Sequence, residues 1–218
     1  MTNTNTASEY LSARQQAIVP IAAFGAAGDI PKLGAALNKG LDAGLTVNET
    51  KEVLIQLYAY AGFPRSLNAL GELMKVVDAR KHRGIQDPQG CVPSRAIPQG
   101  DALRSAGTAN QTKLLGGPVK GPLFEFAPTI GEYLQTHLFG DIFERDNLDW
   151  QSRELATISM LSALAGAESQ LQSHVGIGMK VGLTANQLQQ VAEVLSISGS
   201  ADYAGRVRDA LARHLDRR

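Results

Sequence analysis

Three side chains suited to acid–base and binding chemistry lie close together in the second half of the sequence: Arg153, Glu154 and His174. Histidine titrates near neutral pH and can therefore give or take a proton during a reaction. A glutamate can act as an acid or can orient a histidine. Arginine binds a carboxylate through two parallel hydrogen bonds. These residue types together suit proton transfer on a small anionic molecule.

His174 lies within a stretch that predicts a helix over Glu168–Val181, where glycines at 176 and 178 follow it closely. Each of these glycines weakens a helix by about 0.5–1 kcal/mol relative to alanine. That cost indicates that another helix or a ligand packs closely there. The alternative is a structural histidine beside a tight helix crossing.

Arg153 and Glu154 lie at the start of a predicted helix over Trp150–Leu164, which should pack against the helix that carries His174. The alternative is that Glu154 is favoured there by the helix dipole and that Arg153 is solvated. His137 lies near the end of another predicted helix, where the dipole alone explains a histidine. Tyr58 and Tyr60 are interpreted as core or interface residues that could also wall a pocket.

Composition excludes several classes of function. The 218 residues are 44% hydrophobic and 19% charged, with 21 basic and 21 acidic residues, so the net charge is zero. We therefore expect no nucleic-acid partner. No apolar run is long enough to span a membrane, and we predict a cytoplasmic protein with no membrane partner. Cys91 is the only cysteine, which excludes an internal disulfide, and the four scattered histidines predict no metal site.

The strongest pattern in the sequence is an internal repeat. Gly44-Leu45-Thr46-Val47-Asn48-Glu49 recurs as Gly182-Leu183-Thr184-Ala185-Asn186-Gln187, and Leu33, Gly40 and Val53 recur at the same offset as Leu171, Gly178 and Val191. A constant offset without gaps indicates duplication. Both copies predict a capping box, formed by the threonine and by the acid or amide three residues later. The glycine before it predicts a left-handed end to the preceding helix.

The repeat and the scarcity of alternating β-branched runs predict an all-α fold. We expect helices over Arg14–Ala27, Pro31–Ala43, Thr46–Tyr60, Arg65–Ala79, Trp150–Leu164, Glu168–Val181, Thr184–Ser196 and Asp202–Leu215, with a break at Gly62-Phe63-Pro64. The predicted domains are a first unit over residues 10–80 and a second module over 123–218. Residues 81–122, rich in Gly and Pro, are either a flexible linker or an ordered strap.

The second half resembles the carboxymuconolactone decarboxylase family from Phe124 to Leu215. The residues that carry the resemblance are Phe126-Ala127-Pro128, Leu138-Phe139-Gly140-Asp141-Ile142-Phe143, Asn147-Leu148-Asp149, Ser152-Arg153-Glu154-Leu155-Ala156-Thr157-Ile158, Ser173-His174 and Gly182-Leu183-Thr184. Arg14 to Leu70 resembles the same module without its first helix. The resemblance implies an AhpD-like helical module in two tandem copies.

The family resemblance also implies an activity. Its thiol peroxidase branch needs cysteines where this chain has Ala167 and Gln170, so that mechanism is excluded. The decarboxylase branch implies a cofactor-free carboxy-lyase that acts on a small carboxylated lactone or oxo-acid. His174 and Glu154 would be catalytic, and Arg153, His137 and Tyr60 would bind substrate. No metal or other cofactor is implied.

The first unit has Ala36 at the position of the histidine and Gln16 at the position of the glutamate, so we expect at most one active site per chain. The family also implies a homo-oligomer, with a trimer or a dimer favoured. The alternative function is a non-catalytic oligomeric protein that binds a small molecule or acts as a scaffold.

Overall fold

The computed structural model describes residues 8–216, and every regular element in that range is a helix, which confirms the all-α prediction. None of these helices is both long and apolar enough to cross a bilayer. Their bounds are α1 Ala13–Ala27, α2 Ile30–Asp42, α3 Val47–Gln56, α4 Tyr58–His82, α5 Asp101–Leu115, α6 Pro122–Phe126, α7 Pro128–Tyr133, the π-helix η1 Leu134–Ile142, α8 Trp150–Ser162, α9 Glu168–Lys180, α10 Ala185–Ile197 and α11 Ala201–Leu215.

The chain forms two compact units, and the first is built from both ends of the sequence. Among the described residues it combines 8–89 with 151–216, whereas the second unit is Gly90–Trp150. This division uses boundaries different from the sequence-based domains at 10–80 and 123–218. The last two residues of that predicted second module, 217–218, lie outside the described residues.

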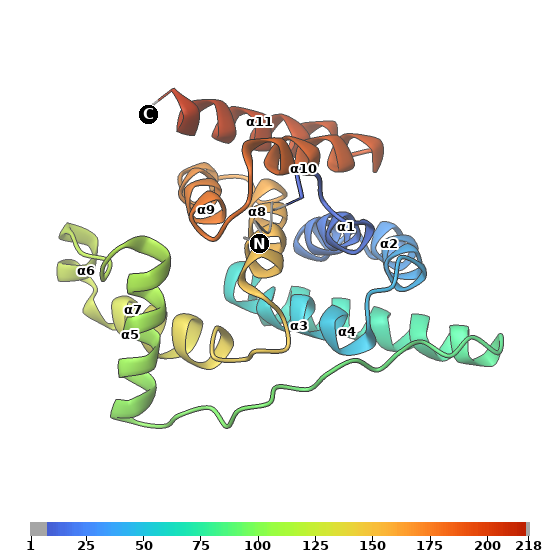
Figure 1. The fold of residues 1–218 in the computed structure, drawn as a ribbon, viewed down its shortest axis with the longest axis horizontal. Helices are drawn as coiled ribbons and strands as arrows, with labels where there is room; N and C mark the ends of the chain where they lie inside the picture. Colours follow the sequence, from blue (N-terminus) through green and yellow to red (C-terminus); the bar gives the residue numbers. More distant parts are fainter. Residues whose placement is uncertain (1–7, 217–218) are drawn as a thin grey trace, which may run out of the picture. The chain divides into compact units, whose positions relative to one another are not determined.

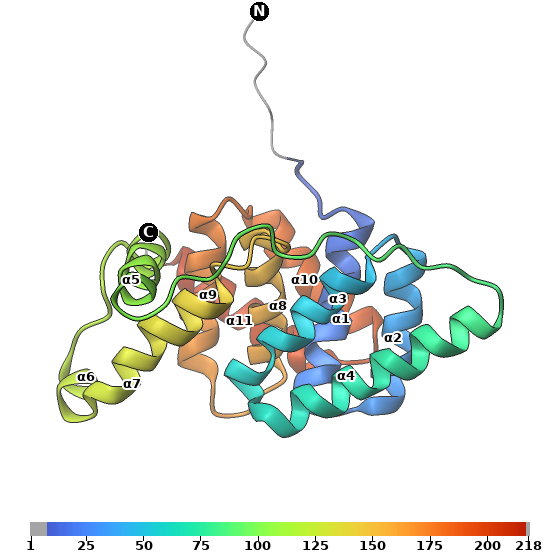
Figure 2. The same cartoon turned by 90° about the horizontal axis from the view of Figure 1, so that it is seen from below.

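The first unit is layered. Figures 1 and 2 show α9, α8, α1 and α2 side by side in that order, with α3 and α4 on one face of this row and α10 and α11 on the other. Helices from the two ends of the sequence therefore share one core. The row places α8 between α9 and α1, which makes α8 the central helix of the unit.

Helix α8 is buried on all sides. Every residue from Ser152 to Ser162 is buried, and Leu155, Ile158 and Met160 have no exposed surface. A helix with one apolar stripe exposes its opposite face to solvent. A helix that is buried on all faces belongs to the core. Because α8 also carries Arg153 and Glu154, the core contains charged groups that need partners.

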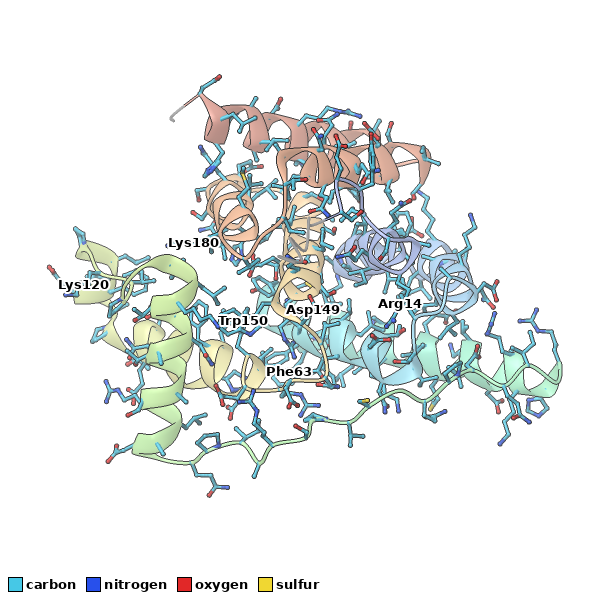
Figure 3. The ribbon with its side chains drawn as sticks, viewed as in Figure 1. Arg14, Phe63, Lys120, Asp149, Trp150 and Lys180 are labelled. Atoms are coloured by element: carbon cyan, nitrogen blue, oxygen red, sulfur yellow. The ribbon has the colours of Figure 1, made fainter. Side chains whose placement is uncertain are left out.

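Both predicted capping boxes are present. Thr46 accepts from the Glu49 N–H at the start of α3, and Thr184 accepts from the Gln187 N–H at the start of α10. Gly44 (φ 91°) and Gly182 (φ 104°) take the left-handed conformation expected before each box. Arg14, labelled in Figure 3, also binds Glu49, so this capping carboxylate ties α1 to α3.

The predicted end of the third helix is wrong by several residues. It was expected to continue to Tyr60, but α3 ends at Gln56 and Tyr60 belongs to α4. The Tyr60 N–H donates to the Leu57 carbonyl three residues earlier, which tightens the turn and redirects the chain. The predicted break lies inside α4, where Gly62 has φ 81° and ψ 162°.

The second unit contains a helix that the sequence analysis did not predict. Residues 81–122 were expected to be a linker or a strap, yet they hold the 15-residue α5. This helix packs on η1 at Gly107, where an added Cβ would lie 1.7 Å from the Gln135 carbonyl oxygen. The close approach explains a glycine in mid-helix, where it otherwise costs stability.

We expect the capping boxes to contribute separately to stability. Thr46→Ala and Thr184→Ala should each lower the free energy of unfolding by about 1 kcal/mol, because each leaves a helix N–H without its side-chain acceptor. Chemical denaturation followed by circular dichroism measures the change. Thr112→Ala, on an exposed face of α5, is the control, and a loss no larger than that of this control would contradict the assignment.

Candidate active site

His174 and Glu154 form a close pair in the core of the first unit. Nδ1 of His174 lies 2.8 Å from Oε2 of Glu154, which joins α9 to the start of α8. The Glu154 side chain is 1% exposed, whereas that of His174 is 14% exposed. The ring therefore has one nitrogen held by a buried carboxylate while part of its surface still reaches solvent. Among the described residues no hydrogen bond to its Nε2 is present.

Oε1 of Glu154 is buried without a hydrogen-bond partner. The hydroxyl of Tyr60 is buried beside this pair, next to the side chain of Thr157. The Tyr60 ring stands edge-on to the His174 ring, with centroids 5.8 Å apart. Burial raises the pKa of Tyr60, and the negative charge of Glu154 raises it further. Tyr60 therefore remains a neutral phenol that can donate a hydrogen bond.

Arg153 is bound entirely within the protein. It has no exposed surface, and its guanidinium lies 3.1 Å from Glu52 and 3.0 Å from the side-chain oxygen of Gln56. Gln56 also donates to the Arg153 carbonyl at 3.0 Å and to Thr157 at 2.8 Å. These contacts fasten the start of α8 to α3.

This geometry does not support the predicted role of Arg153 in substrate binding. A carboxylate from solvent could reach its guanidinium only by displacing Glu52 or Gln56, both of which are buried. Breaking a buried ion pair in that way leaves an uncompensated charge and costs several kcal/mol. Arg153 therefore acts as a structural cation that positions Glu154, the next residue.

The glycines beside His174 are explained by protein neighbours. A Cβ at Gly176 would lie 2.9 Å from the His214 ring, and a Cβ at Gly178 would lie 3.2 Å from Ile158 and from Leu183. The close packing predicted from these glycines is thus present, and its partners are side chains of other elements. His214 lies near the end of α11, and its Nε2 atom is buried.

His137 belongs to the other compact unit. His137 lies on η1 in the second unit, where its Nδ1 is 2.6 Å from Asp141 and its side chain is 47% exposed. Its role in binding stays a prediction. No group of three or more potential metal ligands occurs within residues 8–216.

Sequence reasoning missed the polar residues that support the site: Glu52, Gln56 and Thr157. All three are buried. One signal could have found them, because Glu52 and Gln56 are four residues apart and so share one helical face in an otherwise apolar stretch. Thr157 follows Arg153 by the same spacing.

The arrangement can hold and transfer one proton. A carboxylate bonded to one imidazole nitrogen fixes the tautomer and stabilises the protonated ring. The other nitrogen is then available to a reacting atom. The neutral Tyr60 hydroxyl and Oε1 of Glu154 add a donor and an acceptor at the same place. General acid–base chemistry on a small polar molecule is what this set of groups supports.

A comparison with known protein families finds a match in the second half of the chain. Residues 128–213 match the model described as the carboxymuconolactone decarboxylase family, so the chain carries a domain of this family there. No curated protein matches the sequence. The matched range contains Glu154 and His174, whereas Glu52, Gln56 and Tyr60 precede it.

We expect the Arg153–Glu52 pair to be strongly coupled. Arg153→Met should lower the free energy of unfolding by about 3–5 kcal/mol, because Glu52 is left buried without its cation. The double variant Arg153→Met/Glu52→Leu should recover most of that loss. Denaturant titrations of the two single variants and the double variant form the cycle, and additive losses would contradict the coupling.

The raised pKa of Tyr60 predicts an alkaline effect on stability. In the unfolded chain this phenol ionises near its usual pKa of 10.0, whereas in the folded protein it ionises at higher pH. Its contribution is complete below pH 10 and is lost as pH rises toward the folded-state pKa. We expect Tyr60→Phe to leave stability at pH 8 little changed and to reduce its fall above pH 10, as urea unfolding at the two pH values would show. An identical fall in both proteins would contradict this.

Proposed function

We propose that this chain is a cofactor-free carboxy-lyase that acts on a small carboxylated lactone or oxo-acid. One observation carries the proposal: His174 has one ring nitrogen bonded to the buried carboxylate of Glu154 and still reaches solvent. The carboxymuconolactone decarboxylase family domain at residues 128–213 supports this reaction class. The single cysteine, Cys91, leaves the paired-thiol peroxidase chemistry without its nucleophiles.

The proposed reaction uses His174 as the general acid. Departure of carbon dioxide leaves an electron pair that delocalises into a neighbouring carbonyl of the substrate. The protonated His174 then donates its proton to the carbon that carried the carboxylate, and solvent restores the proton to the ring. Glu154 stabilises the imidazolium between these steps. The net change replaces a carboxylate and a proton by carbon dioxide and a C–H bond.

Tyr60 is the residue that we assign to substrate binding in the first unit. Its hydroxyl is buried and neutral, the protein group next to it is the side chain of Thr157, and its ring lies beside His174. A phenol donor can stabilise the oxygen on which charge develops as carbon dioxide leaves. Because Arg153 is occupied by Glu52, the cation nearest the substrate in this proposal is the imidazolium of His174 itself.

We further propose that residues 10–80 and 123–218 are two AhpD-like modules, of which only the second keeps a site. The recurrence of the capping boxes before α3 and α10 supports this duplication. In the first module the amide of Gln16 donates to the Leu11 carbonyl, and Ala36 is a small buried residue. Neither can hold a proton as Glu154 and His174 do. A cytoplasmic location belongs to the same proposal.

Release of carbon dioxide tests the function. We expect the purified protein to decarboxylate 4-carboxymuconolactone or a related carboxylated lactone or oxo-acid. His174→Ala should lower kcat at least about 100-fold, which is the usual contribution of a general acid. Glu154→Gln should lower kcat with little change in KM. The amide stabilises the protonated ring of His174 less than the carboxylate does, and in this proposal residue 154 does not contact the substrate. Carbon dioxide is measured directly, with thermal unfolding to confirm that each variant folds.

The matched control is His82→Ala, a histidine at the end of α4 whose side chain is 77% exposed. It should keep the activity of the unmodified protein. A His174→Ala variant with full activity would remove His174 from the reaction. If the unmodified protein binds these compounds and releases no carbon dioxide from any of them, the protein is a small-molecule-binding protein and not a lyase.

A further inference from the structure

The side-chain amide of Gln56 can take only one orientation. Its oxygen accepts from Nη1 of Arg153 at 3.0 Å, and its nitrogen donates to Oγ1 of Thr157 at 2.8 Å and to the Arg153 carbonyl at 3.0 Å. In the reverse orientation the amide nitrogen would face a guanidinium that can only donate, and the amide oxygen would face a carbonyl. Neither Gln56 nor Arg153 has exposed surface, so the buried cation fixes which end of the amide is directed at Thr157.

The hydroxyl of Thr157 accepts from this amide and still has its own proton to donate. Its Oγ1 lies 3.0 Å from the Arg153 carbonyl, but two other donors already reach that oxygen. They are the Gln56 amide and the Thr157 N–H, which donates to the residue four positions earlier within α8. Because a carbonyl oxygen has two lone pairs, the hydroxyl would be a third donor. The Thr157 proton is therefore available to a different acceptor.

The hydroxyl oxygen of Tyr60 lies next to Thr157 and can accept this proton. Both groups are buried, so no solvent water competes for the bond. Burial raises the pKa of Tyr60, whereas the Thr157 side chain lowers it. A neighbour that donates to a phenol oxygen has this effect because it stabilises the negative form. With Thr157 as the donor, Tyr60 keeps its own proton for another acceptor.

We propose that Gln56 and Thr157 are positioning residues that direct the proton of Tyr60 toward the substrate. The hydrogen bonds then run in one direction, from Arg153 to Gln56, to Thr157, to Tyr60 and on to an oxygen of the substrate. Only the last of these bonds rests on the proposed function, because the others lie within the protein.

The direction of these bonds selects the substrate group that lies at Tyr60. A phenol that donates is matched by an oxygen that can only accept, such as the carbonyl of a lactone or an oxo-acid. This oxygen gains negative charge as carbon dioxide leaves, and the donor then binds it more strongly. Each hydrogen bond polarises the next, and Arg153 begins the series with a full positive charge. The buried cation thus acts on the substrate through three side chains, although Glu52 and Gln56 occupy its guanidinium.

Neutron diffraction from crystals of the full-length protein exchanged into D₂O locates these protons directly. We expect the deuteron of Thr157 between its Oγ1 and the Tyr60 oxygen, and the deuteron of Tyr60 directed away from Thr157. A Thr157 deuteron directed at the Arg153 carbonyl, or a Tyr60 deuteron directed at Thr157, would overturn the proposal. The measurement needs no substrate, so its result is independent of whether the protein is a carboxy-lyase.

Kinetics of decarboxylation test what these bonds do for the reaction. Thr157→Val should lower kcat about 10-fold with little change in KM, which is the effect of losing one hydrogen bond. Thr157→Ser keeps the hydroxyl and should restore kcat. In a Tyr60→Phe background Thr157→Val should have no further effect, because the donor that it orients is already absent. An equal loss in both backgrounds would assign Thr157 to packing alone and would overturn the proposal.

The matched control is Thr50→Val on α3. Thr50 is also buried, and its hydroxyl also donates to a carbonyl four residues earlier, that of Thr46 at 2.9 Å. Thr50 has no place in the series of bonds that ends at Tyr60, so this variant should keep its kcat. Thermal unfolding checks that each variant is folded. If Thr157→Val does not fold, the deuteron positions in the unmodified protein decide the question.

Discussion

The buried ion pair between Arg153 and Glu52 is the interaction on which the site depends. A guanidinium with no exposed surface is stable only where its hydrogen bonds are met inside the protein. Glu52 and Gln56 of α3 accept hydrogen bonds from its two terminal nitrogens, which fixes the rotation of α8 about its own axis. Successive residues of a helix point about 100° apart. Because Arg153 is directed at α3, the next residue, Glu154, is directed at α9 and meets His174.

Because of this constraint, two neighbouring charged residues have different roles. Arg153 stabilises the packing of α8 on α3, and Glu154 binds the ring of His174. The other polar groups buried on α8 are satisfied locally, since the hydroxyls of Ser159 and Ser162 donate to carbonyls of the same helix. In contrast, Oε1 of Glu154 is buried without a partner beside the rings of Tyr60 and His174. Buried polar atoms without partners are uncommon in folded proteins and mark a place where a ligand or water is expected.

The parts of the fold that could be predicted are those with local signals. The capping boxes at Thr46 and Thr184 and the break at Gly62 follow from a few adjacent residues each. Helix α5 was missed because its glycine at 107 fits only against η1, and no short-range pattern reports that contact. The proximity of Glu154 to His174 could be expected from the predicted packing of their helices. The burial of Arg153 could not, because its partners are about a hundred residues away in the sequence.

The family domain alone does not contain the whole site. Its matched range begins at residue 128, yet Glu52 and Gln56 hold Arg153, and Tyr60 stands against His174. The first half of the chain thus supplies residues that bind Arg153 and a ring that packs against His174. A module that lacked this half would leave Arg153 charged and unpaired in its core unless another chain provided equivalent groups. In the proposed duplication Ala36 and Gln16 stand at the positions of His174 and Glu154, yet the first half still contributes to the site from α3 and α4.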